Sequence, residues 1–393
     1  MARLVVILGA LTAIGPLSID MYLPAFPAIG SSLDAGASQV QLTLTACLAG
    51  LALGQLLAGP ISDRLGRRRP LLAGVSCYVA VSVLCALAPS IEALVALRFL
   101  QGLSGAAGIV IAQAVVRDLY AGTAAVRVFS SLMLVIGLAP ILAPIVGGQM
   151  LRATSWHGIF VALAAIAGGV LAMAALGLRE TLPPARRDRR GLRQTLRTLR
   201  GLLGERTFMA FALGSALVFG GMFAYVSSSP FVLQDIYGAS PQLYSVMFGA
   251  NGIGLVAASQ VNGRLATRFG PVRLLLFGMS VIASGSAVLL VIFATQAVGL
   301  WAVLVSLFVI VSGMGFVLPN ATALALADHP EVAGSASALL GVLQFLIGAV
   351  TAPLTGIAGG DTAVPLGVLM TTMSAAALLV LRVLGGRQVR PWR

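Results

Sequence analysis

The sequence lacks lysine and is poor in charge, cysteine and histidine. Only 9% of its 393 residues are charged, against about 25% in soluble domains, which excludes an ordinary cytosolic enzyme. Disorder is excluded as well, because 59% of the residues are hydrophobic and the mean hydropathy is +1.00. The three cysteines have no paired spacing, so they indicate neither a disulfide framework nor a metal site. The apolar runs are long and unbroken, unlike the alternating strands of a β-barrel, and favour a polytopic α-helical membrane protein.

These hydrophobic residues gather in runs long enough to cross a bilayer, which takes about 20 largely apolar residues. The first run could pass for a signal peptide, but its apolar core is too long and is interrupted by Pro and Asp. We therefore predict twelve transmembrane helices. They lie at about 4–26, 40–60, 71–89, 92–116, 128–151, 157–178, 208–233, 242–262, 272–294, 298–325, 333–357 and 363–383.

The arginines predict how the chain is oriented. The net charge is +13, and with the N-terminus inside, 23 of the 25 basic residues fall in inner segments. The positive-inside rule then predicts a multi-pass protein of the plasma (inner) membrane with both termini cytoplasmic. It also explains the basic composition without a nucleic-acid partner. One inner loop departs from the rule, because Asp328, His329 and Glu331 lie there without a basic residue.

A long polar segment divides the chain. We predict an N-terminal six-helix bundle over 1–178, a cytoplasmic basic linker over 179–206 and a C-terminal six-helix bundle over 207–393. Within the linker, leucines recur at helical spacing with arginines between them, which favours a basic amphipathic helix on the inner leaflet; the alternative is a flexible linker. These leucines are Leu192, Leu196, Leu199 and Leu203.

The two halves repeat a loop. "GPISDRLGRRRP" follows the second run at 59–70, and "GRLATRFGPVR" follows the eighth at 263–273. Three residues match at one offset of 204: Gly59, Arg64 and Gly66 with Gly263, Arg268 and Gly270. We predict two pseudo-symmetric six-helix bundles with a transport site between them, a known transporter architecture.

Away from the span ends, the ionisable groups inside the predicted spans are essentially Asp20 and Arg98. A charge at mid-bilayer costs at least about 2.5–3.5 kcal/mol, so such residues are functional candidates. At 1.5 Å per residue, Asp20 lies about 24 Å from the inner end of its span and Arg98 about 9 Å from the outer end of its own. A buried carboxylate near a cation suits proton loading and release, or binding of a cationic cargo. The alternative is a static ion pair between the first and fourth spans.

The loop after the second span is a candidate gate. Asp63 stands with Arg64 and Arg67 at the cytoplasmic edge, and Gly66 permits a tight turn. The carboxylate could meet the positive N-terminal end of a neighbouring helix and release it as the halves rock. The alternative is that the arginines serve topology alone.

The fifth span is dense in proline and glycine. Proline kinks a helix by removing a backbone donor, and small residues allow close helix approach. We predict a hinge or seal here, with ordinary bundle packing as the alternative. The residues are Pro140, Pro144, Gly147 and Gly148.

Several polar and aromatic residues inside spans are candidates to line a substrate cavity, although packing within the bundle is the more common role of such residues. Together with Asp20, the candidates are Tyr22, Gln101, Tyr225, Phe231, Asn320, Gln344 and Phe345.

Catalytic motifs of soluble enzymes are missing from the sequence: it has no HExxH, no CxxC and no P-loop. We therefore expect no enzyme activity and no cofactor. Without an ATP site, we expect the energy to come from an ion gradient.

At family level, the twelve runs and "GPISDRLGRRRP" resemble the major facilitator superfamily. "RFLQGLSGAAG" at 98–108 resembles its span-four motif, and "APILAPIVGG" at 139–148 its span-five antiporter motif, although Ala139 and Ala143 replace two glycines. "SIDMYLPAFPAI" (18–29), "VVRDLY" (115–120) and "AGSASALLGVLQFLIGA" (333–349) resemble the Bcr/CflA drug-resistance exporters.

This resemblance implies the major facilitator fold and a bicyclomycin- or chloramphenicol-type drug/proton antiporter. By position it implies proton coupling at Asp20 and Arg98. It further implies conformational roles for the loop and span-five residues above and for Arg117 and Asp118. Thr267 stands where Asp63 would recur, so a gate of this kind should be asymmetric.

The sequence therefore predicts proton-coupled efflux of small drugs by alternating access. The partners expected are small-molecule drugs or metabolites, protons and the lipid bilayer, and the protein is expected to be a monomer. A dedicated metabolite exporter or an importer of the same fold remains an alternative. A membrane-embedded enzyme would need clustered acid/base or metal ligands, and a sensor would normally carry a soluble module; the sequence shows neither.

Overall fold

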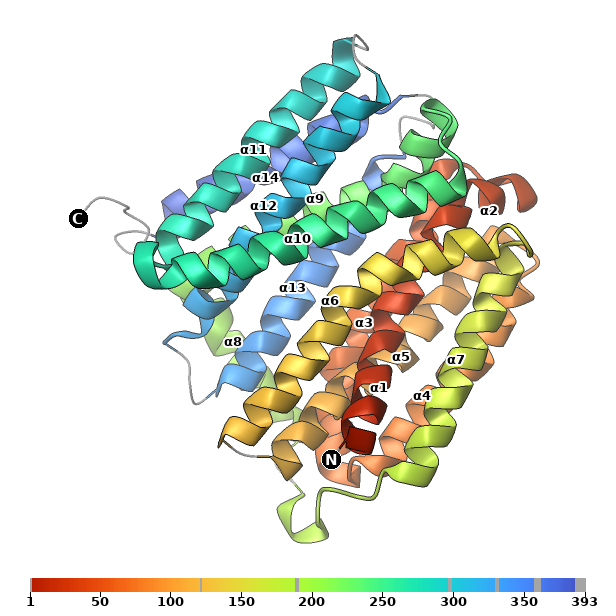
Figure 1. The fold of residues 1–393 in the computed structure, drawn as a ribbon. Coiled ribbons are helices and arrows are strands. Elements are labelled where there is room, and N and C mark those ends of the chain that lie inside the picture. Colours follow the sequence, from red (N-terminus) through yellow and green to blue (C-terminus); the bar gives the residue numbers. More distant parts are fainter. Residues whose placement is uncertain are drawn as a thin grey trace. The chain divides into compact units, whose positions relative to one another are not determined.

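The computed structural model describes residues 2–120, 122–187, 191–295, 299–328, 332–356 and 362–385, and every regular element in those ranges is a helix (Figure 1). By its internal contacts the chain forms two compact units. Unit 1 comprises Met1–Ala35 and Leu42–Arg193, and unit 2 comprises Gly36–Gln41 and Gln194–Arg393. The bundle boundaries expected at 178 and 207 remain a prediction.

Unit 1 contains the first half of the predicted spans. Its helices are α1 (Ala2–Asp20), the short η1 (Leu23–Ala25) and α2 (Phe26–Ser32), most of α3 (Ala37–Leu65), α4 (Arg68–Ala86), α5 (Ile91–Leu119), α6 (Gly122–Met150) and α7 (Trp156–Gly177), followed by η2 (Pro184–Arg186).

Unit 2 contains the second half. Its helices are α9 (Arg206–Pro230), the π-helical η3 (Phe231–Ile236), α10 (Pro241–Phe269), α11 (Pro271–Thr295), α12 (Leu300–Leu326), α13 (Ala333–Leu354) and α14 (Val364–Leu384). Helix α8 (Gly191–Leu203) lies at the boundary between the units in the sequence.

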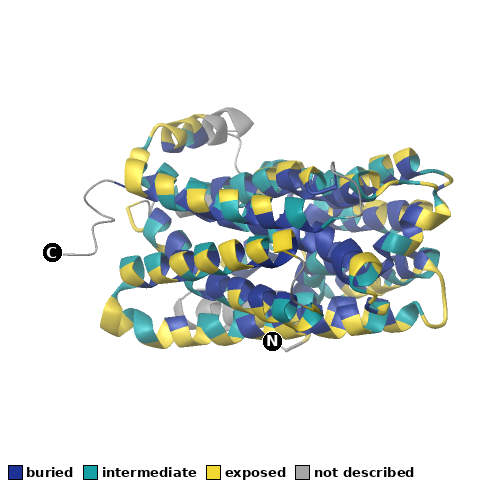
Figure 2. Cartoon of the chain, turned by 90° about the horizontal axis from the view of Figure 1, so that it is seen from above, coloured by how far each residue is buried: buried dark blue, intermediate teal, exposed yellow. Residues whose placement is uncertain are grey.

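All twelve predicted runs coincide with helices, which confirms the predicted all-α polytopic membrane fold. Among the described residues, ten helical segments are long and apolar enough to cross a membrane, and α6 adds a shorter apolar stretch at Gly137–Met150. Helix α10 has 29 residues but is more polar than the ten, with Asn251, Gln260 and Asn262 along it. Many long helices have exposed as well as buried residues (Figure 2). Many of the exposed residues are large and apolar, as expected of helices that face lipid.

The internal repeat appears in the turns that end α3 and α10. Gly66 follows α3 with φ +91°, and Gly270 follows α10 with φ +79°. A side chain would strain both positions, because the left-handed region is open mainly to glycine at helix C-termini. The matched glycines at the 204-residue offset therefore allow the same positive-φ turn at a helix end in each half.

Glycines also bring an equivalent pair of helices into backbone contact in each unit. In unit 1 a Cβ at Gly102 of α5 would lie 2.0 Å from the Cys47 carbonyl oxygen of α3. In unit 2 a Cβ at Gly315 of α12 would lie 2.6 Å from the Leu255 carbonyl oxygen of α10. Small residues allow this approach in membrane bundles, so equivalent helices of the two halves pack in a similar way.

The linker contains the predicted helix, observed as α8. Leu199 is buried, and so is Leu202, whereas Leu203 is exposed. The buried face is therefore shifted by one residue from the predicted stripe. The side chains of Leu192 and Leu196, and the loop residues His329 and Glu331, lie outside the described residues.

Candidate functional site

The first predicted span is broken at its acidic residue. Helix α1 ends at Asp20, and the chain continues through a turn at Met21 and Tyr22 into η1 and α2. Pro24 encodes the break, because it lacks the N–H that would bond to the Asp20 carbonyl in a continued helix. The Met21 N–H still donates to the Leu17 carbonyl oxygen at 3.1 Å. Asp20 therefore occupies the C-terminal end of a helix inside the apolar part of unit 1.

Asp20 is buried, with 6% of its surface exposed. No salt bridge within 4.0 Å joins it to Arg98 or to another described residue. The static ion pair considered as an alternative role is therefore not observed among the described residues. The predicted proton-coupling role of Asp20 stays a prediction at this point.

Arg98 of α5 is fully buried beside the same break. Its Nη2 donates to the Ser18 carbonyl oxygen at 2.8 Å, and its Nη1 donates to Gln101 Oε1. The guanidinium lies over the Tyr22 ring at 4.1 Å and near the Phe160 ring at 5.7 Å. Its Nε has no hydrogen-bond partner among the described residues. Arg98 is thus surrounded by neutral groups, and its contacts seal it from solvent.

The charge of Arg98 is balanced in part by the end of α1. The last carbonyls of a helix are unsatisfied and carry a partial negative charge that favours a cation. Ser18 lies in that last turn, and aromatic faces add attraction worth about 2 kcal/mol when desolvated. Tyr22 and Gln101, predicted to line a substrate cavity, are fully buried parts of this arrangement.

A hydroxyl network beneath Arg98 was missed from the sequence. Gln101 Nε2 donates to Ser82 Oγ at 2.7 Å, and Ser82 in turn donates to the Tyr78 carbonyl oxygen. The Tyr78 hydroxyl lies 2.6 Å from Ser18 Oγ. The i, i+4 spacing of Tyr78 and Ser82 inside an apolar run was the signal available in the sequence.

The predicted gating loop forms an ion cluster within unit 1. Arg67 Nε donates to Asp118 Oδ2 at 2.8 Å, and its Nη1 donates to both Asp63 and Ser62. The Arg67 side chain is only 8% exposed and that of Asp118 15%, whereas Asp63 is 47% exposed. Burial lowers the pKa of Arg67, but the hydrogen bonds to Asp118 and Asp63 outweigh it and raise that pKa overall. The predicted residues Arg64 and Arg117 are exposed.

Glu180, which the sequence analysis did not single out, completes this inner charge cluster. Its carboxylate accepts the backbone N–H of Arg67 at 2.8 Å and of Arg68 at 3.2 Å, and those of Thr181 and Leu182. Partial burial raises the pKa of Glu180, but the four backbone donors outweigh it, so the pKa lies below the usual range. We use "inner charge cluster" for Asp63, Arg67, Asp118 and Glu180.

The span-five residues lie in the well-packed end of α6. Ala143, Pro144, Gly147 and Gly148 are buried, and Pro140 is half-buried. Helix α6 runs beside α1 in unit 1 (Figure 1). This end of α6 therefore adjoins the break in the first span.

The candidates in unit 2 fall into separate groups. The Tyr225 hydroxyl accepts a hydrogen bond from Asn251 Nδ2 at 2.8 Å, and the Tyr225 ring stacks on Phe248. Asn320 Nδ2 donates to Asn262 Oδ1 at 2.6 Å. Both Asn251 and Asn262 lie on α10 and were missed from the sequence.

The remaining two aromatic candidates lie elsewhere in the unit. Phe345 packs edge-to-face against Phe219, and Gln344 is half-buried. Phe231 lines a pocket of unit 2 with Ser228 and Thr355. The predicted second-half residues therefore do not form a single cluster.

Three consecutive serines fix the end of α9. Ser227 Oγ donates to the Ala352 carbonyl oxygen at 2.9 Å, and Ser228 Oγ donates to Thr355 Oγ1. Ser229 Oγ lies 3.2 Å from the Tyr244 hydroxyl. These hydroxyls tie α9 to the end of α13 and to α10.

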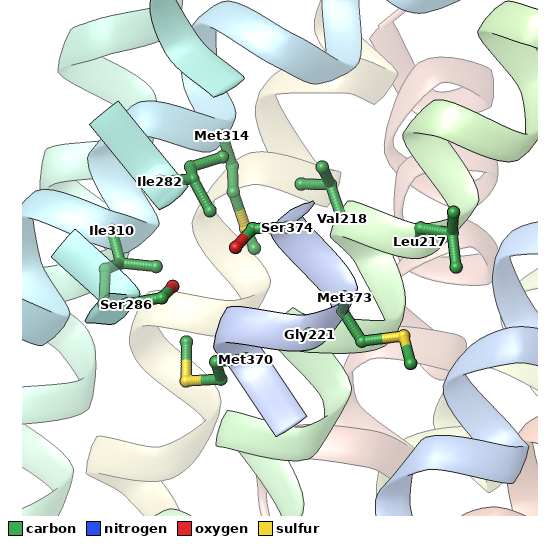
Figure 3. Close-up of a pocket in the computed structure, with 10 residues that line it drawn as sticks. All are labelled: Leu217, Val218, Gly221, Ile282, Ser286, Ile310, Met314, Met370, Met373 and Ser374. Carbon is green, nitrogen blue, oxygen red and sulfur yellow. The ribbon is translucent and has the colours of Figure 1, made fainter. Parts of the chain in front are cut away.

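A methionine-lined cavity lies among α9, α11, α12 and α14 (Figure 3). It has a volume of only about 10 Å³ and is lined by Met314, Met370 and Met373. Ser286 Oγ, on its wall, is buried and has no partner among the described residues. The lining is almost entirely apolar, so this cavity holds no charged group that could serve coupling.

Sequence comparison identifies the family. The family model described as Major Facilitator Superfamily matches residues 8–353. The chain belongs to the major facilitator superfamily. This major facilitator is 44% identical over 367 residues to a protein of Bacillus subtilis named "Uncharacterized MFS-type transporter YdgK", covering 93% of this chain and 90% of that protein.

Other relatives of this major facilitator carry drug-resistance names. A "Bicyclomycin resistance protein homolog" of Haemophilus influenzae is 32% identical, covering 95% of this chain and 92% of that protein. A "Chloramphenicol resistance protein" of Pseudomonas aeruginosa is 32% identical, covering 98% and 92%. These relatives confirm the resemblance to the drug-resistance family.

Solved structures support the fold of this major facilitator. A peptide transporter POT in complex with sulfate superposes with TM-score 0.77 at 16% identity, covering 99% of this chain and 95% of that chain. The xylose transporter XylE from E. coli superposes with TM-score 0.75 at 14% identity, covering 97% and 96%. The chain is therefore a multi-pass membrane protein with the major facilitator fold.

Proposed function

We propose that this major facilitator exports small drugs across the inner membrane in exchange for protons, by alternating access and with both termini cytoplasmic. Asp20 exchanges the proton, and cargo and proton compete for the state in which this carboxylate is charged. The protein works as a monomer, without enzyme activity or cofactor.

The observation that carries this proposal is the buried Asp20 at the break of the first span. A charge held within the apolar part of a membrane protein is costly and is retained where it serves an ion or proton pathway. Its burial at 6% exposure, without a salt-bridge partner among the described residues, leaves protonation as the way to neutralise it.

The drug-resistance names of two 32% identical relatives support drugs as cargo. The membrane potential supplies about 2.3 kcal/mol per elementary charge per 100 mV, and a pH gradient adds to it. That energy is enough to concentrate a cargo by a factor of about 50 for each charge moved at 100 mV.

The test is an Asp20→Asn variant in a drug-sensitive host that lacks its own pumps, compared by a resistance panel and then by drug uptake into proteoliposomes with an imposed pH gradient. Asp34→Asn is the matched control, because Asp34 is exposed just beyond α2. We expect Asp20→Asn to abolish uphill transport at normal membrane levels and Asp34→Asn to transport as wild type. Uphill transport by Asp20→Asn at the wild-type rate would overturn the proposal.

The same vesicles separate the alternative cargoes. A dedicated metabolite exporter would give no resistance to any drug of the panel but would show proton release driven by a metabolite gradient. An importer would move its cargo in the same direction as the protons, whereas an exporter would move it in the opposite direction.

A further inference from the structure

The break in the first span exposes backbone groups that other helices must satisfy. Beyond Asp20 the chain no longer follows the α-helical pattern, and a short turn is closed by the Ala25 N–H donating to the Tyr22 carbonyl oxygen at 2.9 Å. Unsatisfied carbonyls inside a membrane protein cost several kcal/mol each, so such a break persists only where neighbours support it. Among the helices that approach it, α5 and α6 contact the backbone on either side of Asp20.

Helix α6 contacts the break through Gly147. A Cβ on Gly147 would lie 1.9 Å from the Met21 carbonyl oxygen and 2.9 Å from the Met21 carbonyl carbon. Cβ contacts shorter than 3.0 Å are essentially never observed, so any side chain here would displace Met21 by more than 1 Å. The atom that must move is backbone, which cannot be avoided by a change of rotamer.

Helix α5 holds the opposite side of α1. Arg98 bonds to the Ser18 carbonyl oxygen, and a Cβ on Gly108 would lie 2.9 Å from the Leu11 carbonyl oxygen. The last turn of α1 is therefore fixed on α5 before the chain reaches Asp20. A displacement of Met21 by α6 must then be absorbed at Ile19 and Asp20, the two residues between the supports.

We propose that Gly147 is a positioning residue for Asp20: by admitting the Met21 carbonyl against α6, it sets where the break falls and where the Asp20 carboxylate points. This assigns the span-five glycine a role within unit 1, beside the acidic residue, in addition to the hinge or seal expected from the sequence. The inference rests on the proposed role of Asp20 in proton exchange.

The groups that can influence Asp20 near the break are few. Arg98 and Tyr22 adjoin the turn itself, and the other titratable groups that interact with Arg98 are Cys47 of α3 and Tyr78 and Cys85 of α4. None of them lies on α6 near Gly147. A change at Gly147 therefore reaches Asp20 through the backbone and not through a new charge.

The experiment compares Gly147→Ala with Gly169→Ala in the intact transporter reconstituted in vesicles. Gly169 lies in α7 of the same unit, where an added Cβ meets nothing within 4 Å. The readout is the pH dependence of Asp20 modification by dicyclohexylcarbodiimide, which reacts with protonated carboxyls, measured by mass spectrometry. Melting temperature in detergent shows whether each variant is folded, and the pH profile of transport is recorded in parallel.

We expect Gly147→Ala to shift the midpoint of Asp20 modification by about one pH unit, since the carboxylate moves to a different environment. The transport pH profile should shift with it, and Gly169→Ala should match the wild type in both. A folded Gly147→Ala with an unchanged modification profile would overturn the inference.

A second variant covers the case in which Gly147→Ala does not fold. Pro24→Ala restores the N–H that a continued helix would give to the Asp20 carbonyl, without adding bulk against α6. It should also shift Asp20 modification, and an unchanged profile in Pro24→Ala would equally contradict the inference. If instead both variants shift the modification while Asp20→Asn still transports uphill, the positioning role stands and the proposed coupling role fails.

Discussion

In each unit the second long helix ends in a turn with a positive-φ glycine, but the side chains around the two turns differ in charge. In unit 1 the turn after α3 carries the inner charge cluster, in which Arg67 bonds to Asp63 and Asp118 and Glu180 accepts two backbone N–H groups of the turn. In unit 2 the turn after α10 has Thr267 and Pro271 where Asp63 and Arg67 would recur.

The link between equivalent helices in unit 2 is neutral. Asn262 of α10 bonds to Asn320 of α12, and Thr267 bonds only to the Arg264 carbonyl oxygen of its own helix. A charged link responds to pH and salt, whereas an amide pair does not. The two halves therefore share the backbone conformation of the turn but differ in its charges.

The largest effect is expected at the charged link. Arg67→Gln removes the partner of a mostly buried carboxylate at Asp118, which should destabilise the protein by about 2–3 kcal/mol. The measurement is the melting temperature in detergent, with transport in vesicles alongside. Arg67→Lys keeps the charge but not the forked geometry and should recover part of the loss. Equal stability of Arg67→Gln and the wild type would show that the cluster is only a surface feature.

A smaller effect is expected at the neutral link. Asn320→Leu leaves the Asn262 amide buried without its partner, at a cost of about 1–2 kcal/mol. The double variant with Asn262→Leu should recover most of this loss, because replacing both polar partners by apolar groups is nearly neutral. If the double variant loses as much free energy of unfolding as the two single variants together, the two amides do not form a neutral link and the proposed contrast between the units fails.

The stability that Glu180 gives to the charged turn of unit 1 should depend on pH, unlike that of the neutral link in unit 2. Its folded-state pKa is lowered, so its contribution to stability is present above the ordinary glutamate pKa of about 4.3 and is lost as the pH falls through the lower folded value. Glu180→Gln should cost about 1 kcal/mol at pH 7 and abolish this acid-dependent loss. Melting temperatures at several pH values below 5 measure it, and a parallel loss in wild type and variant would assign it to other carboxylates.

The smallest effect is expected from restoring the missing acid in unit 2. Thr267→Asp places a carboxylate at an exposed position one turn before Pro271, which offers no side-chain charge. The stability should change by less than about 0.5 kcal/mol. A stabilisation as large as the loss in Arg67→Gln would mean that unit 2 retains a hidden cation partner for this position.

Much of the fold could be predicted because hydrophobic runs extend over whole helices. The twelve runs coincide with helices, and the glycines at the 204-residue offset do mark equivalent turns. The break of the first span was missed, although Pro24 carried the signal, because proline alone does not distinguish a kink from a break.

The candidate site was less predictable because it depends on side-chain direction. Asp20 and Arg98 were identified from their charge, but the sequence could not show that Arg98 would bond to a backbone carbonyl rather than pair with the carboxylate. Glu180 was overlooked because its partners are backbone N–H groups, which leave no pattern in the sequence.

The three serines at the end of α9 have one further consequence. Successive residues of a helix point about 100° apart. The hydroxyls of Ser227, Ser228 and Ser229 therefore leave α9 in three directions, and each bonds to a different group. A rotation of α9 about its own axis would break all three hydrogen bonds at once. We therefore expect the end of α9 to move together with the end of α13 and the start of α10 whenever unit 2 changes conformation.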